Sequence, residues 1–159
     1  MVVVCMLALS GCGAVETMET ISDDVVVPVM KEAAQVQLVL PDLDDTQVIE
    51  DGIGGRIYLC EGYSVTVQTL DGGDLYGTLE SVSGFDADKL TVLKTERSSY
   101  SEARCAWSAV GEGENIICRA VILDDGCYHY AVTVMADASR ITAQPDLWDI
   151  LDTVEISIG

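Results

Sequence analysis

The sequence predicts a single α+β domain, in which a mainly antiparallel sheet of about six to seven strands is covered by two or more helices. The apolar share of 49% is enough for a core of ordinary size in a chain of 159 residues. Short segments in which apolar and polar residues alternate follow one another across turns, as in antiparallel meanders. Helical spacing of apolar residues occurs in two segments, and strands grouped with few helices are typical of α+β domains.

The domain is predicted to begin with a strand at residues 35–40, which alternates and then stops at Pro41. An acidic loop follows at residues 41–55. Residues 56–60 and 63–70 are the next β-rich segments. Glu61 and Gly62 between them provide a turn, so we expect a hairpin.

Residues 75–85 are predicted to form a short helix, because Leu75, Leu79 and Val82 recur at helical spacing. Asp74 is a favourable N-cap, since its carboxylate can accept hydrogen bonds from the backbone of the first turn. Gly84 suits the end of the helix, because glycine readily adopts the left-handed conformation that closes one.

The second half is predicted to be a meander followed by a helix and a last strand. Strands are expected at residues 90–94, 103–110, 116–123 and 127–136, and Asp125 and Gly126 between the last two are typical of a two-residue hairpin loop. Pro145 suits a first helical position, and Leu147, Trp148 and Leu151 follow it as an apolar stripe. Residues 154–158 alternate as a strand.

Both faces of the central strands are apolar. Tyr128 and Tyr130 share one face with Val121 and Leu123, whereas Trp107 lies on the other face. We therefore expect helices on both faces of the sheet, and we expect these aromatic residues in the core rather than in a ligand platform.

The N-terminus contains an apolar run at residues 2–9, which is far shorter than the roughly 20 residues of a membrane-spanning helix. A short apolar run followed by small residues is typical of a secretory signal. The segment LSGC at Leu9–Cys12 resembles the lipobox of bacterial lipoproteins. The resemblance implies that the Cys12 thiol receives a diacylglyceryl group and that cleavage makes Cys12 the new N-terminus.

This resemblance divides the chain into a lipoprotein signal peptide at residues 1–11, an acidic flexible linker at 12–33 and a globular domain at 34–159. The expected location is the extracytoplasmic face of a cell membrane, with the lipid on Cys12 as the anchor. Such signals normally start with Lys or Arg, whereas nothing basic precedes Lys31, which favours a start upstream of Met1. The alternative is that the first residues form a buried strand of a cytosolic protein.

The net charge of −19 argues against whole classes of partner. With 8 Lys and Arg residues against 27 Asp and Glu residues, the chain lacks the basic stripe that nucleic acid requires. Anionic head groups would also be repelled, so membrane attachment is expected through buried hydrocarbon alone. Two acyl chains are enough for stable anchoring.

Four cysteines would remain in the exported domain: Cys60, Cys105, Cys118 and Cys127. If the turn between the strands expected at 103–110 and 116–123 has four loop residues, Trp107 faces Cys118 and Cys105 faces Ala120. Cys105 and Cys118 then lie diagonally on one face. A one-residue bulge would bring them opposite each other, which makes Cys105–Cys118 the favoured disulfide and leaves Cys60 with Cys127. The alternative is that some or all are small buried thiols.

Cys127 and His129 share a strand face, which is the minimum for a nucleophile or half of a metal site. With a two-residue loop, Asp124 faces Cys127 and Ile122 faces His129. His129 is the single histidine, however, and the sequence has no GxSxG, P-loop or HExxH motif. We therefore expect a histidine that is hydrogen-bonded beneath the hairpin, no enzyme activity and no cofactor.

The acidic loop holds oxygen ligands at Asp42, Asp44 and Asp45, which are weak candidates for a metal site. An EF-hand loop counted from Asp42 requires glycine at its sixth position and glutamate at its twelfth, where this sequence has Gln47 and Ile53. A solvated loop is expected, and an irregular calcium site is the alternative.

The order of elements over residues 35–158 is similar to the PsbP-like α/β/α sandwich, and the chain also resembles small lipoproteins of Gram-positive bacteria. We expect a surface-tethered binding or interaction module for a protein, peptide or envelope partner. One alternative is a metal-ion or small-ligand scavenger that uses the acidic loop. Another is an unrecognised hydrolase that uses Cys127 or an acidic pair.

Overall fold

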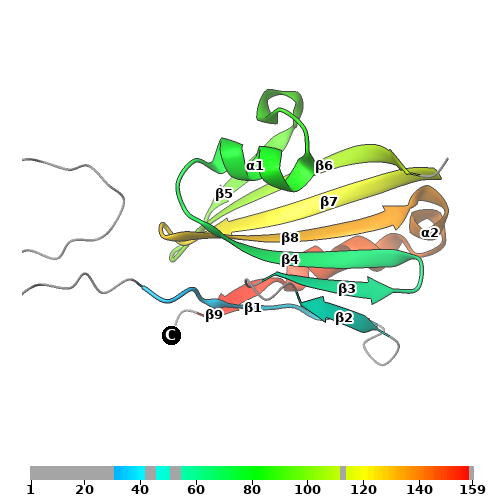
Figure 1. Cartoon of the computed structure of the whole chain (residues 1–159), viewed down its shortest axis with the longest axis horizontal. Helices are drawn as coiled ribbons and strands as arrows, with labels where there is room; N and C mark the ends of the chain where they lie inside the picture. Colours follow the sequence, from blue (N-terminus) through cyan, green and yellow to red (C-terminus); the bar gives the residue numbers. More distant parts are fainter. Residues whose placement is uncertain (1–30, 42–45, 51–54, 112–113, 158–159) are drawn as a thin grey trace, which may run out of the picture.

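The computed structural model describes residues 31–41, 46–50, 55–111 and 114–157 (Figure 1). The predicted signal peptide, the lipidation site at Cys12 and most of the predicted linker lie outside these residues, and so do Asp42, Asp44 and Asp45. Within the described chain, no helix combines the length and the apolar character that a membrane span requires.

A seven-stranded sheet forms the centre of the molecule, in the order β2-β3-β4-β8-β7-β6-β5 (Figure 1). Its strands are β2 (Gln47–Glu50), β3 (Arg56–Cys60), β4 (Tyr63–Asp71), β5 (Val92–Glu96), β6 (Ser101–Gly111), β7 (Glu114–Asp124) and β8 (Tyr128–Asp137). All neighbouring pairs are antiparallel, and the β4–β8 pair joins the two meanders. The predicted antiparallel sheet is therefore confirmed.

Helix α1 (Leu75–Ser83) lies across one face of the sheet (Figure 1). It begins and ends as predicted. The backbone N–H of Tyr76 donates a 3.0 Å hydrogen bond to the Asp74 carboxylate, and Gly84 closes the helix with a φ of 74°. Leu79 is buried with Ile122 in the core cluster on this face.

The opposite face is covered by a two-stranded ribbon and a 3₁₀ helix. The elements here and at the chain end are β1 (Gln35–Gln37), α2 (Ala138–Ala143), η3 (Pro145–Thr153) and β9 (Glu155–Ser157), and a further 3₁₀ turn, η2 (Ala87–Lys89), follows α1. β1 pairs with β9, and Leu147, Ile150 and Leu151 of η3 are buried against the larger core cluster. The covering α-helices are thus fewer than expected, since in the described chain α1 alone covers a face.

Two predicted elements differ in kind from those observed. The strand expected at 35–40 ends at Gln37 and pairs with β9 outside the main sheet. The helix that begins at Pro145 is a 3₁₀ helix, and its buried residues are Leu147, Ile150 and Leu151.

Two elements were missed by the sequence pattern. β2 lies in the predicted acidic loop, and both Val48 and Ile49 are exposed, so the strand shows no alternation of buried and exposed residues. α2 has six residues and none of them is buried, so it carries no apolar stripe.

The predicted register is right for one hairpin and wrong for the next. Cys105 lies opposite Ala120 in the β6–β7 pair, as expected. In the β7–β8 pair, Asp124 lies opposite His129 rather than Cys127, because the turn is centred one residue later than predicted: the backbone N–H of Asp125 donates to the carbonyl of Tyr128, so Gly126 and Cys127 lie at the tip. The backbone N–H groups of Cys127 and Tyr128 bond to the Asp125 carboxylate, which stabilises the shifted turn.

The predicted division of the core between two faces is confirmed. Val121, Leu123 and Tyr130 are buried in the larger cluster, on the side of η3 and the β1–β9 ribbon. Ile122 is buried in the smaller cluster beneath α1, and Trp107 packs against it while staying partly exposed.

Candidate functional site

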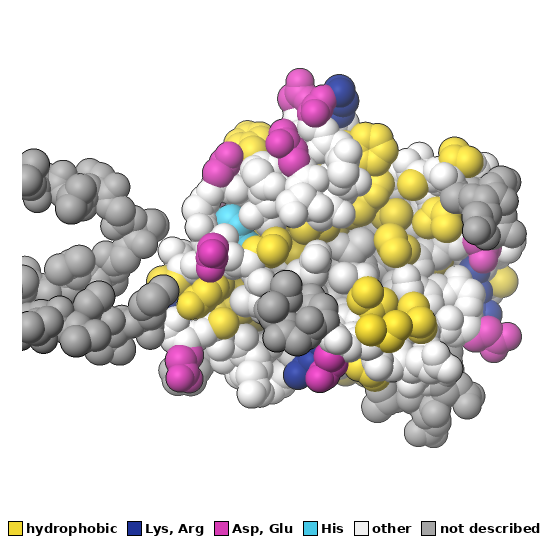
Figure 2. Space-filling view, in the orientation of Figure 1, with side chains coloured by type: hydrophobic (Ala, Val, Ile, Leu, Met, Phe, Trp, Pro, Cys, Tyr) yellow, Lys and Arg dark blue, Asp and Glu magenta, His cyan; other side chains and the backbone are white. Residues whose placement is uncertain are grey.

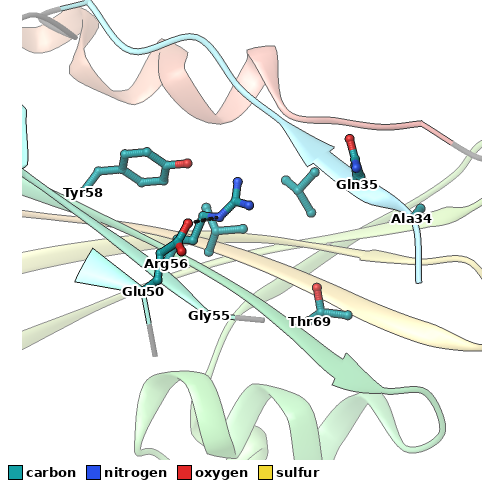
Figure 3. Close-up of a pocket in the computed structure, with 9 residues that line it drawn as sticks. Ala34, Gln35, Glu50, Gly55, Arg56, Tyr58 and Thr69 are labelled. Atoms are coloured by element: carbon teal, nitrogen blue, oxygen red, sulfur yellow. Dashed lines mark ion pairs between the residues drawn. The ribbon is translucent and has the colours of Figure 1, made fainter. Parts of the chain in front are cut away.

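A cavity of about 410 Å³ lies between β1 and the three strands β2, β3 and β4 (Figure 3). The residues that line it come from these strands and the positions next to them: Ala34, Gln35, Val36, Glu50, Gly55, Arg56, Tyr58, Val67 and Thr69. The volume falls within the range of small-molecule pockets, about 300–1,000 Å³.

Strand register places the polar groups of this cavity on one face. Arg56 lies opposite Glu50 on β2 and opposite Val67 on β4. Because side chains alternate along a strand, Arg56 and Tyr58 of β3 share the face that β1 covers. Figure 3 shows the Arg56 guanidinium and the Tyr58 phenol directed into the space between β3 and β1. The Arg56 Nε lies 3.2 Å from the Glu50 Oε1.

These groups can bind and orient a polar ligand. The guanidinium of Arg56 donates hydrogen bonds, the carboxylate of Glu50 accepts them, and the amide of Gln35 and the hydroxyl of Thr69 do both. The two charged side chains are 54% and 66% exposed, so a ligand can reach them from solvent. Val67 provides an apolar patch beside them.

A second groove of about 430 Å³ lies between η3 and strands β5, β6 and β7, and its Arg104, Arg119 and Asp152 side chains already contact other groups of the fold. The Arg119 guanidinium lies 4.5 Å from the centre of the Trp148 ring. Arg104 forms ion pairs with Glu102 and Asp152. Burial lowers the pKa of Arg104, but its two carboxylate partners outweigh burial and raise it. These contacts hold η3 on the sheet.

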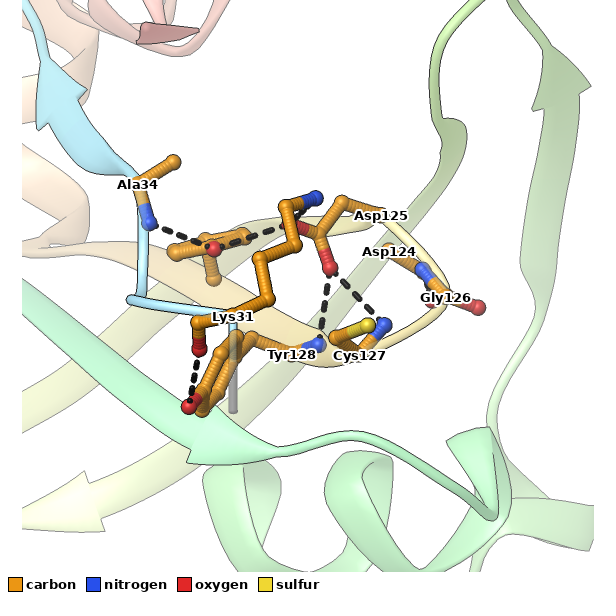
Figure 4. Close-up of polar contacts among 8 residues, drawn as sticks. Lys31, Ala34, Asp124, Asp125, Gly126, Cys127 and Tyr128 are labelled. Carbon is orange, nitrogen blue, oxygen red and sulfur yellow. Dashed lines mark hydrogen bonds and ion pairs between the residues drawn. The ribbon is translucent and has the colours of Figure 1, made fainter. Parts of the chain in front are cut away.

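A polar cluster joins the β7–β8 turn to residues 31–34, the segment that precedes β1 (Figure 4). The Asp125 side chain is 0% exposed and accepts four hydrogen bonds. Its Oδ1 accepts from the backbone N–H groups of Cys127 (2.9 Å) and Tyr128 (2.8 Å). Its Oδ2 accepts from Lys31 Nζ and the Tyr130 hydroxyl, both at 3.0 Å. We call this group the Asp125 cluster.

Two tyrosines extend the Asp125 cluster to the backbone of residues 31–34. The N–H of Ala34 donates to the Tyr130 hydroxyl (2.8 Å), and the Tyr128 hydroxyl donates to the carbonyl of Lys31 (2.9 Å). Burial would raise the pKa of Asp125, but the hydrogen bonds outweigh burial and lower it. Burial and the Asp125 carboxylate raise the pKa of Tyr130 to about 12.

His129 is fully buried beneath α1, and the expectation of a hydrogen-bonded histidine is confirmed. Its Nδ1 lies 2.6 Å from the Thr78 hydroxyl. Its Nε2 lies 3.6 Å from the Asp124 carboxylate, and has no hydrogen-bond partner among the described residues. Cys127 is exposed at the turn, and the hydrogen-bond partner of the imidazole is Thr78 rather than this thiol.

The four cysteines of the described chain are free thiols in this structure. Cys105 and Cys118 lie diagonally, as the register predicts, and the β6–β7 ladder runs without the bulge that would bring them opposite each other. Burial raises the pKa of Cys105 to about 11 and also raises the pKa of Cys118, so both thiols stay protonated at neutral pH. The Cys105–Cys118 disulfide stays a prediction.

No cluster of three His, Cys, Asp or Glu residues that could hold a metal ion occurs in the part of the chain that the structure describes. The weak candidates Asp42, Asp44 and Asp45 lie outside that part, so the acidic-loop metal site stays a prediction.

Sequence reasoning missed the cavity, because its walls come from segments that are distant in the chain. Residues 34–36 form one wall and residues 50–69 contribute the other. A signal exists in residues 56–60, where Arg56 and Tyr58 alternate with Ile57 and Leu59. This alternation places a guanidinium and a phenol on one face of the hairpin.

Neither protein families nor curated proteins match this sequence. Among solved structures, a Bacteroides thetaiotaomicron VPI-5482 protein is similar with a TM-score of 0.49 and 13% identity. The match covers 77% of this chain and 45% of that one, so the chain spans less than half of its length. LpqN of Mycobacterium tuberculosis, which is involved in cell envelope biogenesis, is similar with a TM-score of 0.41 and 11% identity over 79% of this chain and 86% of LpqN. Similarities this distant do not assign a function.

Proposed function

We propose that the protein is a lipid-anchored, extracytoplasmic binding module, and that a small polar ligand occupies the cavity between β1 and β2–β4. The observation that carries the proposal is this cavity, whose lining residues include a guanidinium, a carboxylate, an amide and a hydroxyl. The lipobox-like segment at Leu9–Cys12 supports the location.

The lining of the cavity favours one class of ligand. Arg56 and Glu50 neutralise each other, so the cavity has no strong preference for an anion or a cation. Neutral donors and acceptors at Gln35 and Thr69 extend the polar surface. A small, uncharged or zwitterionic molecule with several hydroxyl, amide or amino groups would satisfy these side chains.

The anchor is tested by localising the full chain and its Cys12→Ala variant in the native host, with mass spectrometry of the mature N-terminus. The wild type should carry an acyl mass on Cys12 and partition with membranes, whereas Cys12→Ala should not. Cys5→Ala is the matched control, because it removes a cysteine from the apolar run and leaves LSGC intact. A membrane-bound Cys12→Ala variant together with an unmodified wild type would exclude the lipid anchor.

The ligand is tested by thermal denaturation of the full chain with amino acids, sugars and polyols, each at millimolar concentration. A ligand present at 100 times its Kd should stabilise the protein by about 2.7 kcal/mol. Gln35→Leu should weaken this binding at least tenfold. Gln37→Leu is the matched control, since it lies on the same strand and does not line the cavity. The cavity proposal fails if no compound raises the melting temperature, or if both variants respond alike.

A further inference from the structure

Strand β2 forms one edge of the seven-stranded sheet (Figure 1). It pairs with β3 along its whole length, from Gln47 opposite Leu59 to Glu50 opposite Arg56. None of the strands in the described chain pairs with its other side. Backbone N–H and C=O groups point to both sides of a strand, so this edge presents groups that can bond to another strand.

β2 exposes apolar side chains on both faces of the sheet. Val48 and Ile49 are each 50% exposed, and they point to opposite faces. On the face of Ile49, the apolar surface continues to Ile57 and Leu59 of β3, which are 37% and 39% exposed. Figure 2 shows hydrophobic side chains over β2 and β3, on the part of this face that α1 leaves open. We call these four residues the β2 surface.

The opposite edge of the sheet, β5, is built differently. Lys94 lies in the middle of this strand, with its Nζ 5.2 Å from the centre of the Tyr76 ring on α1. A lysine on an edge strand opposes the addition of another strand, because pairing would remove water from the charge. The segment Gln47–Glu50 contains neither lysine nor proline, so β2 lacks the protection that β5 has.

Charge decides which kind of strand the β2 surface would accept. Residues 41–55 include five acidic residues and no basic residue, in a chain whose net charge is −19. A second copy of the chain would carry the same net negative charge and would be repelled. A segment that carries Lys or Arg would be attracted instead.

We propose that β2 binds an extended, basic segment of a partner protein, which adds to the sheet as a further strand. This site is separate from the cavity and does not depend on a cavity ligand. Main-chain hydrogen bonds along the β2 edge would provide affinity, as in other strand-addition complexes. Apolar residues at alternate positions of the partner would contact Ile49 and Ile57, which gives the site its selectivity.

The test uses two synthetic ten-residue peptides with the full chain. The first alternates lysine and valine, and the second has the same sequence with alternate backbone nitrogens methylated, so it keeps the charge and loses the donors of one edge. Fluorescence anisotropy should give a Kd at least tenfold lower for the unmethylated peptide. Hydrogen exchange should show new protection of the β2 amides when that peptide is bound.

Ile49→Lys tests the surface, and Leu93→Lys on β5 is the matched control. Both substitutions add the same charge to an exposed position of an edge strand, since these side chains are 50% and 65% exposed. Ile49→Lys should weaken binding of the unmethylated peptide at least tenfold, whereas Leu93→Lys should change the Kd less than twofold. Circular dichroism should show that both variants keep the wild-type fold.

Three outcomes would overturn the proposal. Equal binding of the two peptides would mean that charge alone attracts them. Protection, in the free protein, of the β2 amides that point away from β3 would mean that the chain already covers this edge. Self-association of the peptide-free chain in sedimentation, lost in Ile49→Lys and retained in Leu93→Lys, would make a second copy the occupant. None of these outcomes depends on the cavity, so the proposed function is tested separately.

Discussion

Asp125 lies in a hairpin turn, yet its carboxylate is buried. It accepts hydrogen bonds both from the segment before β1 and from strand β8. Lys31 reaches it from the segment that leads into β1, and Tyr130 reaches it from β8. A buried carboxylate without partners would be strongly destabilising, so these contacts are needed together. The turn is therefore also the point at which the N-terminal segment is attached to the domain.

We expect Asp125→Asn to destabilise the protein by about 2 kcal/mol at neutral pH, because an amide nitrogen would face the Lys31 ammonium where Oδ2 now accepts. The pKa of Asp125 is lowered in the folded state. Its contribution is therefore complete above the ordinary value of 3.8 and is lost as the pH falls through the lower folded value. Urea denaturation from neutral to acid pH measures both effects.

The matched control is Asp146→Asn, at an exposed position of η3. It should leave both the stability at neutral pH and the acid dependence close to those of the wild type. If Asp125→Asn and the wild type lose stability in parallel below the ordinary pKa, the Asp125 cluster does not contribute to acid sensitivity.

Residue patterns could predict Asp125–Gly126 as a turn but not the role of the carboxylate. A two-residue loop at Asp125 and Gly126 follows from the preference for Asp-Gly pairs, and it leads to the wrong partner for His129. The observed turn is centred one residue later, and contacts of the Asp125 carboxylate with Lys31 and Tyr130 stabilise it. Lys31 is distant along the chain, so its contact leaves no local trace in the sequence.

Helix α1 is attached to the sheet by a buried polar contact as well as by Leu79. The Thr78 hydroxyl and the His129 Nδ1 are 2.6 Å apart, and both residues are buried. The short helix needs such tertiary contacts, because nine residues form only a marginal helix in isolation.

We expect Thr78→Val to destabilise the protein by about 1–3 kcal/mol, since it leaves the imidazole Nδ1 buried without a partner. Hydrogen exchange should show faster opening of α1, with smaller changes in the central strands β7 and β8. Thr78→Ser is the matched control, because it keeps the hydroxyl and should retain most of the stability. A larger loss in Thr78→Ser than in Thr78→Val would mean that the methyl group, which valine keeps, holds α1 rather than the hydrogen bond.

Elements with at least one buried face were predictable, and elements without one were not. α1 and β3, β4, β6, β7 and β8 have caps, turns or alternation that depend on neighbouring residues alone. β2 is exposed on both faces, and α2 buries no residue, so neither has an amphipathic pattern. The cavity was also unpredictable, because it forms only where β1 crosses β2–β4.

Across the whole molecule, acidic residues outnumber basic ones by 27 to 8, and the fold must tolerate their mutual repulsion. Two unit charges 10 Å apart in water repel by about 0.4 kcal/mol. Many such pairs act together in a chain of this net charge, so screening them should stabilise the folded state.

We expect the free energy of unfolding to rise by on the order of 1–2 kcal/mol between low salt and about 1 M NaCl, where the Debye length is about 3 Å. Thermal or urea denaturation over this range measures the effect, and KCl should act like NaCl. Destabilisation by salt would show that ion pairs such as Lys31–Asp125 outweigh the general repulsion. Stabilisation by millimolar calcium alone would instead favour a metal site at Asp42, Asp44 and Asp45.

The attachment of residues 31–34 at the β7–β8 turn has a mechanical consequence. Tension applied at Lys31 along the chain would first load the contacts of Lys31, Tyr128 and Tyr130, and would next shear β1 against β9. β1 belongs to the small ribbon, so the seven-stranded sheet is spared. β1 is also one wall of the cavity. Tension on the N-terminal side of Lys31 would therefore change the shape of this cavity before it disturbs the rest of the fold.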